Sequence, residues 1–125
     1  MDLAGTAAAA GERTGVIWTL LESNDLNANL VRFEAGGGVG DHITDEVDVV
    51  FVGVSGTGSV LTNGEERRLS AGTLVLVGKG ARRSILSRSE GFSYLTIHRR
   101  RGPLQIESEA PSRPNYRSLL RPNTT

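Results

Sequence analysis

The sequence predicts an all-β protein, a single domain folded as a sandwich or a barrel. Three observations support this prediction. The middle of the chain is a series of short runs rich in β-branched residues, turn residues separate these runs, and no stretch shows a convincing helix of ten residues. A chain of 125 residues can bury one sizeable core but not two, so we expect one domain.

Eight runs in the middle of the chain are predicted strands. Each is short and contains the β-branched and aromatic residues that strands favour. They span residues 16–21, 29–33, 48–54, 59–62, 66–69, 73–77, 82–87 and 92–98. Short strands at regular spacing are typical of a sandwich or a barrel.

Turn signals lie between the predicted strands. The strongest is Asn63-Gly64, because both residues tolerate the positive φ angles of a two-residue hairpin loop. The glycine-containing segments 70–72 and 78–80 are further predicted turns. These turns are expected to join antiparallel neighbours.

The two ends of the chain lack the strand pattern. Residues 1–14 are small and polar without periodicity, and we expect a flexible N-terminal segment there. Residues 107–125 contain three prolines among Ser, Asn and Thr, which predicts an irregular, Pro-rich C-terminal tail. The domain itself is expected to span residues 15–106.

Composition excludes several classes of function. Lys and Arg together number 14, as do Asp and Glu, so the chain lacks the basic charge that nucleic-acid binding requires. Without cysteine, the chain has no disulfide, no thiolate metal site and no cysteine nucleophile. No run approaches the roughly 18 apolar residues of a membrane helix, and the N-terminus lacks the pattern of a signal peptide. We therefore expect a cytoplasmic protein that binds neither nucleic acid nor membranes.

The stretch from Gly36 to Ile85 resembles the paired motifs of the cupin superfamily. In that family the first motif runs from a glycine to His-x-His and, three or four residues later, to a Glu on a strand that ends at a glycine. The second runs from a glycine over five residues to Pro-x-Gly and, two residues later, to a His. Here residues 36–48 read GGGVGDHITDEVD and residues 72–83 read GTLVLVGKGARR. The resemblance implies a cupin-type double-stranded β-helix, a jelly-roll barrel.

The chain departs from the family pattern at most of its metal-ligand positions. His42 occupies the first His position, Thr44 the second, Asp48 the Glu position and Arg83 the final His position. The strand from Asp48 to the next glycine is one residue longer than the pattern. One ligand is kept, one is shortened and two are lost, so the sequence predicts no metal cofactor.

The expected role of this altered site depends on what Arg83 binds. A guanidinium stays charged and offers only hydrogen-bond donors, so it cannot replace a metal ligand. One arrangement pairs Arg83 with Asp48 inside the barrel in a salt bridge that takes the place of the metal. Another has Arg83 bind an anionic or carbonyl-bearing small molecule through two parallel hydrogen bonds. His42 is either a general base or a hydrogen-bonded polar residue.

The last predicted strand allows two arrangements. Side chains alternate along a strand, so one set of alternate residues faces the barrel interior. The inner set is either Phe92, Tyr94, Thr96 and His98, or Leu95 and Ile97. In the first case His98 joins the candidate site.

A metal site of different composition is the alternative. Two histidines and one carboxylate can hold one divalent transition metal, such as iron, manganese, nickel or zinc. The available side chains are His42, His98, Asp41, Asp45, Glu46 and Asp48. This site requires Arg83 to turn away, and we favour the interpretation in which Asp45 and Glu46 face solvent in a loop.

The sequence thus predicts a small-molecule-binding cupin domain without the usual metal centre. Its predicted ligand-binding residues are His42, Thr44, Asp48, Arg83 and His98. The alternatives are a metal-dependent cupin enzyme of the dioxygenase or isomerase class and a filled, inert barrel that acts as a sensor or interaction module. The resemblance also implies a homodimer. We expect it to form by sheet extension through residues 16–21 or through the C-terminal tail, because the apolar residues around Trp18 need a surface to cover them.

Overall fold

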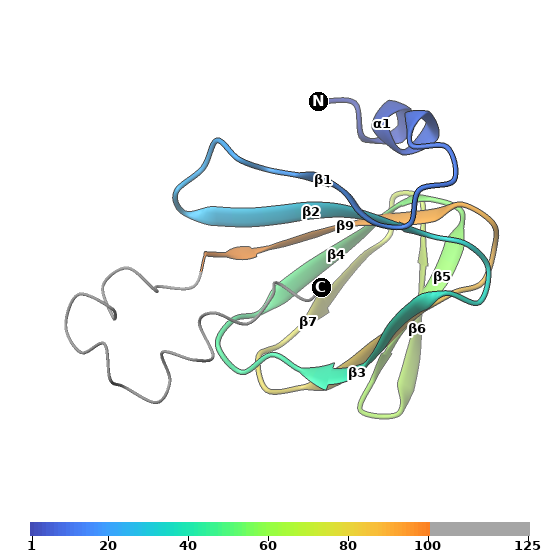
Figure 1. Ribbon diagram of the computed structural model, residues 1–125. Coiled ribbons are helices and arrows are strands. Elements are labelled where there is room, and N and C mark those ends of the chain that lie inside the picture. The colour runs from blue at the N-terminus through green and yellow to red at the C-terminus, as the bar shows by residue number, and fades with distance from the viewer. Residues whose placement is uncertain (101–125) are drawn as a thin grey trace.

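The computed structural model describes residues 1–100, which form one short helix and nine strands (Figure 1). The helix is α1 (Leu3–Ala9), and the strands are β1 (Gly15–Thr19), β2 (Leu26–Phe33), β3 (Gly38–Ile43), β4 (Val49–Ser55), β5 (Thr57–Thr62), β6 (Glu65–Ser70), β7 (Leu74–Val77), β8 (Arg82–Ser87) and β9 (Phe92–Arg99). The predicted all-β class is confirmed. The predicted tail, and the last residues of the predicted domain, lie outside the described residues.

The strands form two antiparallel sheets that enclose the core. The five-stranded sheet, here sheet A, has the order β1-β2-β9-β4-β7, and the four-stranded sheet B has the order β3-β8-β5-β6. Neighbours in each sheet are often distant in the chain, as β2 and β9 are, so the chain passes repeatedly between the sheets (Figure 1). This arrangement is the predicted jelly-roll barrel.

The strand β3 was not predicted from the sequence. Its glycines weaken the strand signal, yet β3 pairs with β8 through Gly38↔Leu86 and Val39↔Ile85. A Cβ atom on Gly38 would lie 2.0 Å from the carbonyl oxygen of Ile85. Gly38 therefore permits a backbone approach that any larger residue would prevent.

The predicted hairpin at Asn63-Gly64 is confirmed and joins β5 to β6. Both residues have positive φ angles, 50° for Asn63 and 83° for Gly64, as a two-residue turn of this kind requires. The turn fixes the β5–β6 register, in which Thr62 lies opposite Glu65.

Residues 1–14 contain a regular element that the sequence did not predict. The carboxylate of Asp2 caps α1 by accepting a hydrogen bond from the backbone N–H of Gly5 at 3.0 Å. Ala7 and Ala10 are buried, and the helix packs against β2 and β4 on the outer face of sheet A. The flexibility expected of this segment stays a prediction. No helix of the described residues is long and apolar enough to cross a membrane.

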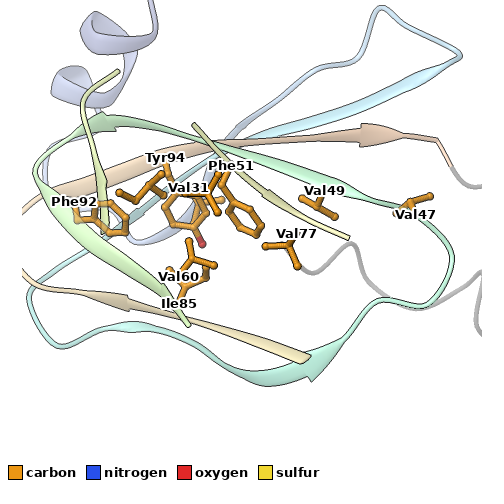
Figure 2. Close-up of a cluster of buried hydrophobic side chains, with 11 residues drawn as sticks. Val31, Val47, Val49, Phe51, Val60, Val77, Ile85, Phe92 and Tyr94 are labelled. Carbon is orange, nitrogen blue, oxygen red and sulfur yellow. The ribbon is translucent and has the colours of Figure 1, made fainter. Parts of the chain in front are cut away.

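The core lies between the two sheets (Figure 2). The ring of Tyr94 stacks with that of Phe92 at a centroid distance of 5.2 Å and meets that of Phe51 at 5.9 Å. Phe92 packs directly on Gly58, where an added Cβ would lie 2.4 Å from the ring. Because Phe92 and Tyr94 are core residues, the alternation along β9 is settled: Leu95 faces outward.

Candidate ligand-binding site

Three polar residues form a row across the inner face of sheet B. His42 of β3 lies opposite Arg83 of β8, and Arg83 lies opposite Thr62 of β5. Residues directly opposite each other in antiparallel strands project to the same face of the sheet. Arg83 is only 1% exposed and contacts the ring of Phe51, so this face is the interior of the barrel. We call these three residues the polar row.

The guanidinium of Arg83 brings a permanent positive charge into the barrel. Its central carbon lies 5.7 Å from the centroid of the Phe51 ring, which belongs to the opposite sheet. This distance falls within the range of about 6 Å in which a cation is attracted to an aromatic face. Phe51 is itself fully buried, with its ring directed into the core (Figure 2). The charge thus lies between the two sheets, in contact with an aromatic ring of sheet A.

The hydrogen bond of His42 defines which ring nitrogen carries the proton. Nδ1 lies 2.9 Å from the carbonyl oxygen of Gly40, and because a carbonyl only accepts, Nδ1 must donate. In the neutral ring Nε2 then presents a lone pair. Nε2 is buried and has no hydrogen-bond partner among the described residues, and the same is true of Thr62 Oγ1. Both members of the row that flank Arg83 thus have unused hydrogen-bonding capacity.

Asp48 does not lie in this site, and the predicted Asp48–Arg83 ion pair is wrong. Asp48 is exposed, and its Oδ1 accepts a hydrogen bond from the backbone N–H of Lys79 at 2.8 Å. Its neighbours Val47 and Val49 are each only 1% exposed. Alternation along the chain therefore directs Asp48 outward, where it stabilises the turn at residues 78–80.

Val49 occupies the position at which the family pattern has its carboxylate. It follows Thr44 with four residues between them, which the pattern allows, and six residues separate it from Gly56. The sequence contained this signal, because the strand counted from Asp48 was one residue too long. Val49 therefore supplies no carboxylate to the barrel interior at that position.

Thr44 and His98 have different positions relative to the polar row. Thr44 is buried at 3% exposure just after β3, and its carbonyl accepts a hydrogen bond from the N–H of Gly80 at 2.8 Å. His98 lies on sheet A at the end of β9 and is buried, with Nδ1 2.8 Å from the carbonyl oxygen of Arg99.

Of the five predicted residues, the strand register brings together His42 and Arg83. Thr62 was missed, because only the β5–β8 pairing places it there.

The residues present do not fit a divalent metal ion. Within residues 1–100, no three His, Asp or Glu side chains are grouped so that they could hold one. Asp41 forms an exposed ion pair with Arg82 at 3.1 Å, and Asp45 is exposed. Arg83 adds a positive charge at one ligand position, which would repel a cation. No chemical step at this site is therefore attributed to a metal.

Three surface carboxyls have shifted pKa values. Hydrogen bonds from Ser59 and Arg88 lower the pKa of the Glu66 carboxyl. Glu34 and Glu90 share a hydrogen bond, which lowers the pKa of Glu34 and raises that of Glu90. These carboxyls are solvent-exposed and belong to the surface rather than to the candidate site.

Comparison with known proteins identifies the fold. No family's sequence model matches the chain, and no curated protein matches it. The solved structure of KdgF from Halomonas sp. is similar, with 23% identity, coverage of 67% of this chain and 76% of that one, and a TM-score of 0.63. A cupin-2 domain protein from Shewanella frigidimarina has 25% identity, coverage of 70% and 80%, and a TM-score of 0.57. The cupin domain of Cnp3 from Schizosaccharomyces pombe has 19% identity, coverage of 66% and 61%, and a TM-score of 0.60.

These similarities define the class of this protein. The chain has the cupin fold, a double-stranded β-helix, as the resemblance of its two motifs predicted. At this level of identity the likeness establishes the fold alone.

Proposed function

We propose that this chain is a small-molecule-binding cupin domain that holds an anionic, carboxylate-bearing ligand in the barrel without a metal. The observation that supports the proposal is the buried Arg83, set in register between His42 and Thr62. A guanidinium presents two parallel N–H donors that match the two oxygens of a carboxylate. Hydrogen bonds to charged groups contribute about 1.5–3 kcal/mol each, so one such pair can anchor a small ligand.

The environment of Arg83 favours this role over metal chemistry. Val49 and Thr44 leave the family's ligand positions without a carboxylate or a second imidazole, whereas Arg83 turns the same place into an anion-binding one. The face of Phe51 orients the guanidinium and excludes water from one side of it. A ligand with a carbonyl instead of a carboxylate would use the same donors with less affinity.

Thermal unfolding of the full chain tests this proposal. Acetate, propionate and benzoate are compared with the corresponding neutral amides, each with and without a chelator. A ligand at a hundred times its Kd stabilises the folded state by about 2.7 kcal/mol. We expect the carboxylates to raise Tm, the amides to have no effect, and the chelator to change nothing.

Two results would overturn the proposal. If no carboxylate raises Tm at millimolar concentration, the polar row is structural and the barrel is inert. If the increase appears only with added transition metal, and elemental analysis finds about one metal per chain, the protein is instead a metal-dependent cupin.

We also propose that the protein is a homodimer that associates through the part of the outer face of sheet A that α1 leaves exposed, next to the edge strand β7. Two rows of apolar side chains cross this face in register and contain no charged residue. They are Trp18, Leu30, Leu95, Val52 and Leu74, and Ala28, Ile97, Val50 and Leu76. Leu30 and Ala28 are already buried within the chain, so a second copy would cover the other members of the two rows. Leu74 and Leu76 on the edge strand β7 are 62% and 58% exposed. An uncharged patch on a chain of zero net charge can pair with itself across a two-fold axis.

Sedimentation equilibrium tests the dimer. The paired substitution Leu74→Lys and Leu76→Lys should give a monomer, because four like charges would meet at the interface. Leu21→Lys is the matched control, since Leu21 is 82% exposed but lies outside both rows. A wild-type monomer at micromolar concentration, or equal dissociation by the control, would contradict this interface.

A further inference from the structure

The turn between β5 and β6 contains the only Asn-Gly pair of the chain, Asn63-Gly64. An asparagine is chemically labile when the backbone nitrogen of the next residue can attack its side-chain amide. A following glycine makes this attack easiest, because it has no side chain to shield its nitrogen or to restrict its backbone angles. The two residues that specify the hairpin therefore also form a reactive pair.

The structure leaves both reacting groups accessible. Asn63 and Gly64 are exposed, and a Cβ added to Gly64 would meet no atom within 4 Å. The side-chain amide of Asn63 forms no hydrogen bond within residues 1–100, whereas its backbone N–H donates to the carbonyl oxygen of Arg82 at 3.1 Å. Exposed turns of this kind also open locally at little cost in free energy, which gives the attacking nitrogen room to move.

The other described asparagines lack one or more of these properties. Asn29 is buried, and its amide is hydrogen-bonded on both sides: Oδ1 accepts from Thr19 at 2.8 Å and Nδ2 donates to Asn27 at 3.1 Å. Asn27 lies on the same strand. Asn24 is exposed but precedes Asp25, whose side chain hinders attack by its own backbone nitrogen. These three asparagines are controls within the same molecule.

We propose that Asn63 is a site of spontaneous deamidation, through a succinimide formed with the backbone nitrogen of Gly64. The Gly64 nitrogen loses its proton to solvent and bonds to Cγ of Asn63, and the bond from Cγ to Nδ2 breaks. Nδ2 takes up a proton and leaves as ammonia. Water then opens the ring at either of its two carbonyl carbons, which gives aspartate or isoaspartate at position 63. Water is the only co-reactant.

The two products should affect the hairpin differently. Aspartate keeps the normal backbone, and Asp-Gly also favours a two-residue hairpin turn. Isoaspartate carries the chain through its side-chain carbon, which lengthens the backbone of the turn that sets the pairing of Thr62 with Glu65. Either product adds a carboxylate beside Glu65 and lowers the net charge of the chain by one unit from zero.

Incubation of the full chain in mildly alkaline buffer, followed by peptide mass spectrometry, tests the proposal. Replacement of an amide by a carboxyl group changes the mass of the peptide that contains it. We expect nearly all of the change to occur at Asn63, and at a rate that increases with pH because the Gly64 nitrogen must lose its proton. The peptides with Asn24, Asn27 and Asn29 should stay unchanged over the same time. A protease that cleaves before aspartate but not before isoaspartate distinguishes the two products.

Two variants assign the change to position 63. Asn63→Gly removes the amide, and Gly-Gly also forms a two-residue turn at positive φ angles, so this variant should fold. On anion exchange it should lose the acidic species that accumulates in wild type. Asn24→Gly is the matched control and should accumulate that species at the wild-type rate. If Asn63→Gly does not fold, the comparison of the four asparagines in wild type tests the proposal alone.

Three results would overturn the proposal. The first is conversion of Asn63 in the folded protein no faster than that of Asn24, and the second is an acidic species that persists in Asn63→Gly. The third is conversion of Asn63 that occurs in urea but not in the folded protein, since the turn would then protect the amide. None of these measurements depends on the polar row, so the proposed function is tested separately.

Discussion

Two adjacent rows of side chains on sheet B, built on the same three strands, have opposite character. In the first, Ile85 of β8 lies opposite Val39 of β3 and Val60 of β5, and Ile85 and Val60 are 3% and 0% exposed. The second is the polar row, which begins two residues away along β8. Both rows face the barrel interior, so the backbone gives them equivalent surroundings.

The two rows differ in their expected roles: the apolar row stabilises the fold, and the polar row is the proposed ligand site. The apolar row contributes to folding by removing its side chains from water, as every core residue does. The polar row places a charge and two hydrogen-bonding groups where burial is unfavourable. Because the polar row is the proposed ligand site, we expect the two rows to respond differently to substitution.

The largest expected effect on folding is in the apolar row. Ile85→Ala removes buried methylene and methyl groups and leaves a cavity, which should lower the free energy of unfolding by about 2–5 kcal/mol. Leu86→Ala, at the half-buried neighbouring position on the outer face, is the matched control and should lower it by less. Urea denaturation measures both. A loss for Ile85→Ala no larger than that of the control would show that this row is not core.

Arg83→Met should mainly affect ligand affinity and have little effect on the free energy of unfolding. Carboxylate affinity should fall about tenfold to a hundredfold, because charge-assisted hydrogen bonds of about 1.5–3 kcal/mol are lost. The free energy of unfolding should change by less than about 1 kcal/mol or rise, since an apolar chain of similar length replaces a buried charge. Calorimetric titration and urea denaturation measure the two quantities.

Arg82→Met serves as the control for Arg83→Met. Arg82 precedes Arg83 on β8, but its side chain is 58% exposed and faces outward. We expect neither affinity nor stability to change by a measurable amount. Loss of binding in this variant would mean that surface charge, and not the polar row, attracts the ligand.

Thr62→Val should produce a smaller change of the same kind. It removes a buried hydroxyl that no described residue contacts by a hydrogen bond, so the free energy of unfolding should stay the same or rise by up to about 1 kcal/mol. Carboxylate affinity should fall by about threefold to tenfold as one neutral donor is lost. A strongly destabilised variant would show that the hydroxyl has a structural partner.

The smallest expected effect concerns the outer surface of the same sheet. The pKa of Glu66 is lowered in the folded state, so this carboxylate stabilises the fold at neutral pH. The contribution is present above the ordinary pKa of 4.5 and is lost as pH falls through the lower folded value. Glu66→Gln should be less stable than wild type at pH 7, and the difference should vanish by about pH 3.

Ser59→Ala provides the matched variant for Glu66, since Ser59 donates the hydrogen bond that contributes most to the lowered pKa. The pH dependence of urea denaturation should be weaker in this variant. An unchanged difference between Glu66→Gln and wild type from pH 7 to pH 3 would contradict the assignment.

Sequence reasoning predicted the fold because strand and turn signals are local. The hairpin at Asn63-Gly64 follows from two residues, and the position of Arg83 follows from its spacing after Gly72. The strand β3 was missed because its glycines are required by a close approach of β8, a distant segment of the chain.

The candidate site was only partly predictable, because it depends on register. Asp48 and Val49 differ by one position, and that single step moves a side chain from the barrel interior to solvent. Thr62 joins the site only because β5 pairs with β8, which no local pattern indicates. His42 and Arg83 could be predicted from the motif, whereas Thr62, contributed by a neighbouring strand, could not.

Urea denaturation of wild type and Arg83→Met, with and without propionate at a hundred times the wild-type Kd, tests the central claim most directly. We predict that propionate raises the free energy of unfolding of wild type by about 2.7 kcal/mol and leaves that of Arg83→Met unchanged, while the two proteins are similarly stable without ligand. The contrary result is an Arg83→Met protein less stable by about 3–5 kcal/mol without ligand, together with no effect of propionate on wild type. Arg83 would then be a structural charge, and the polar row would belong to the core after all.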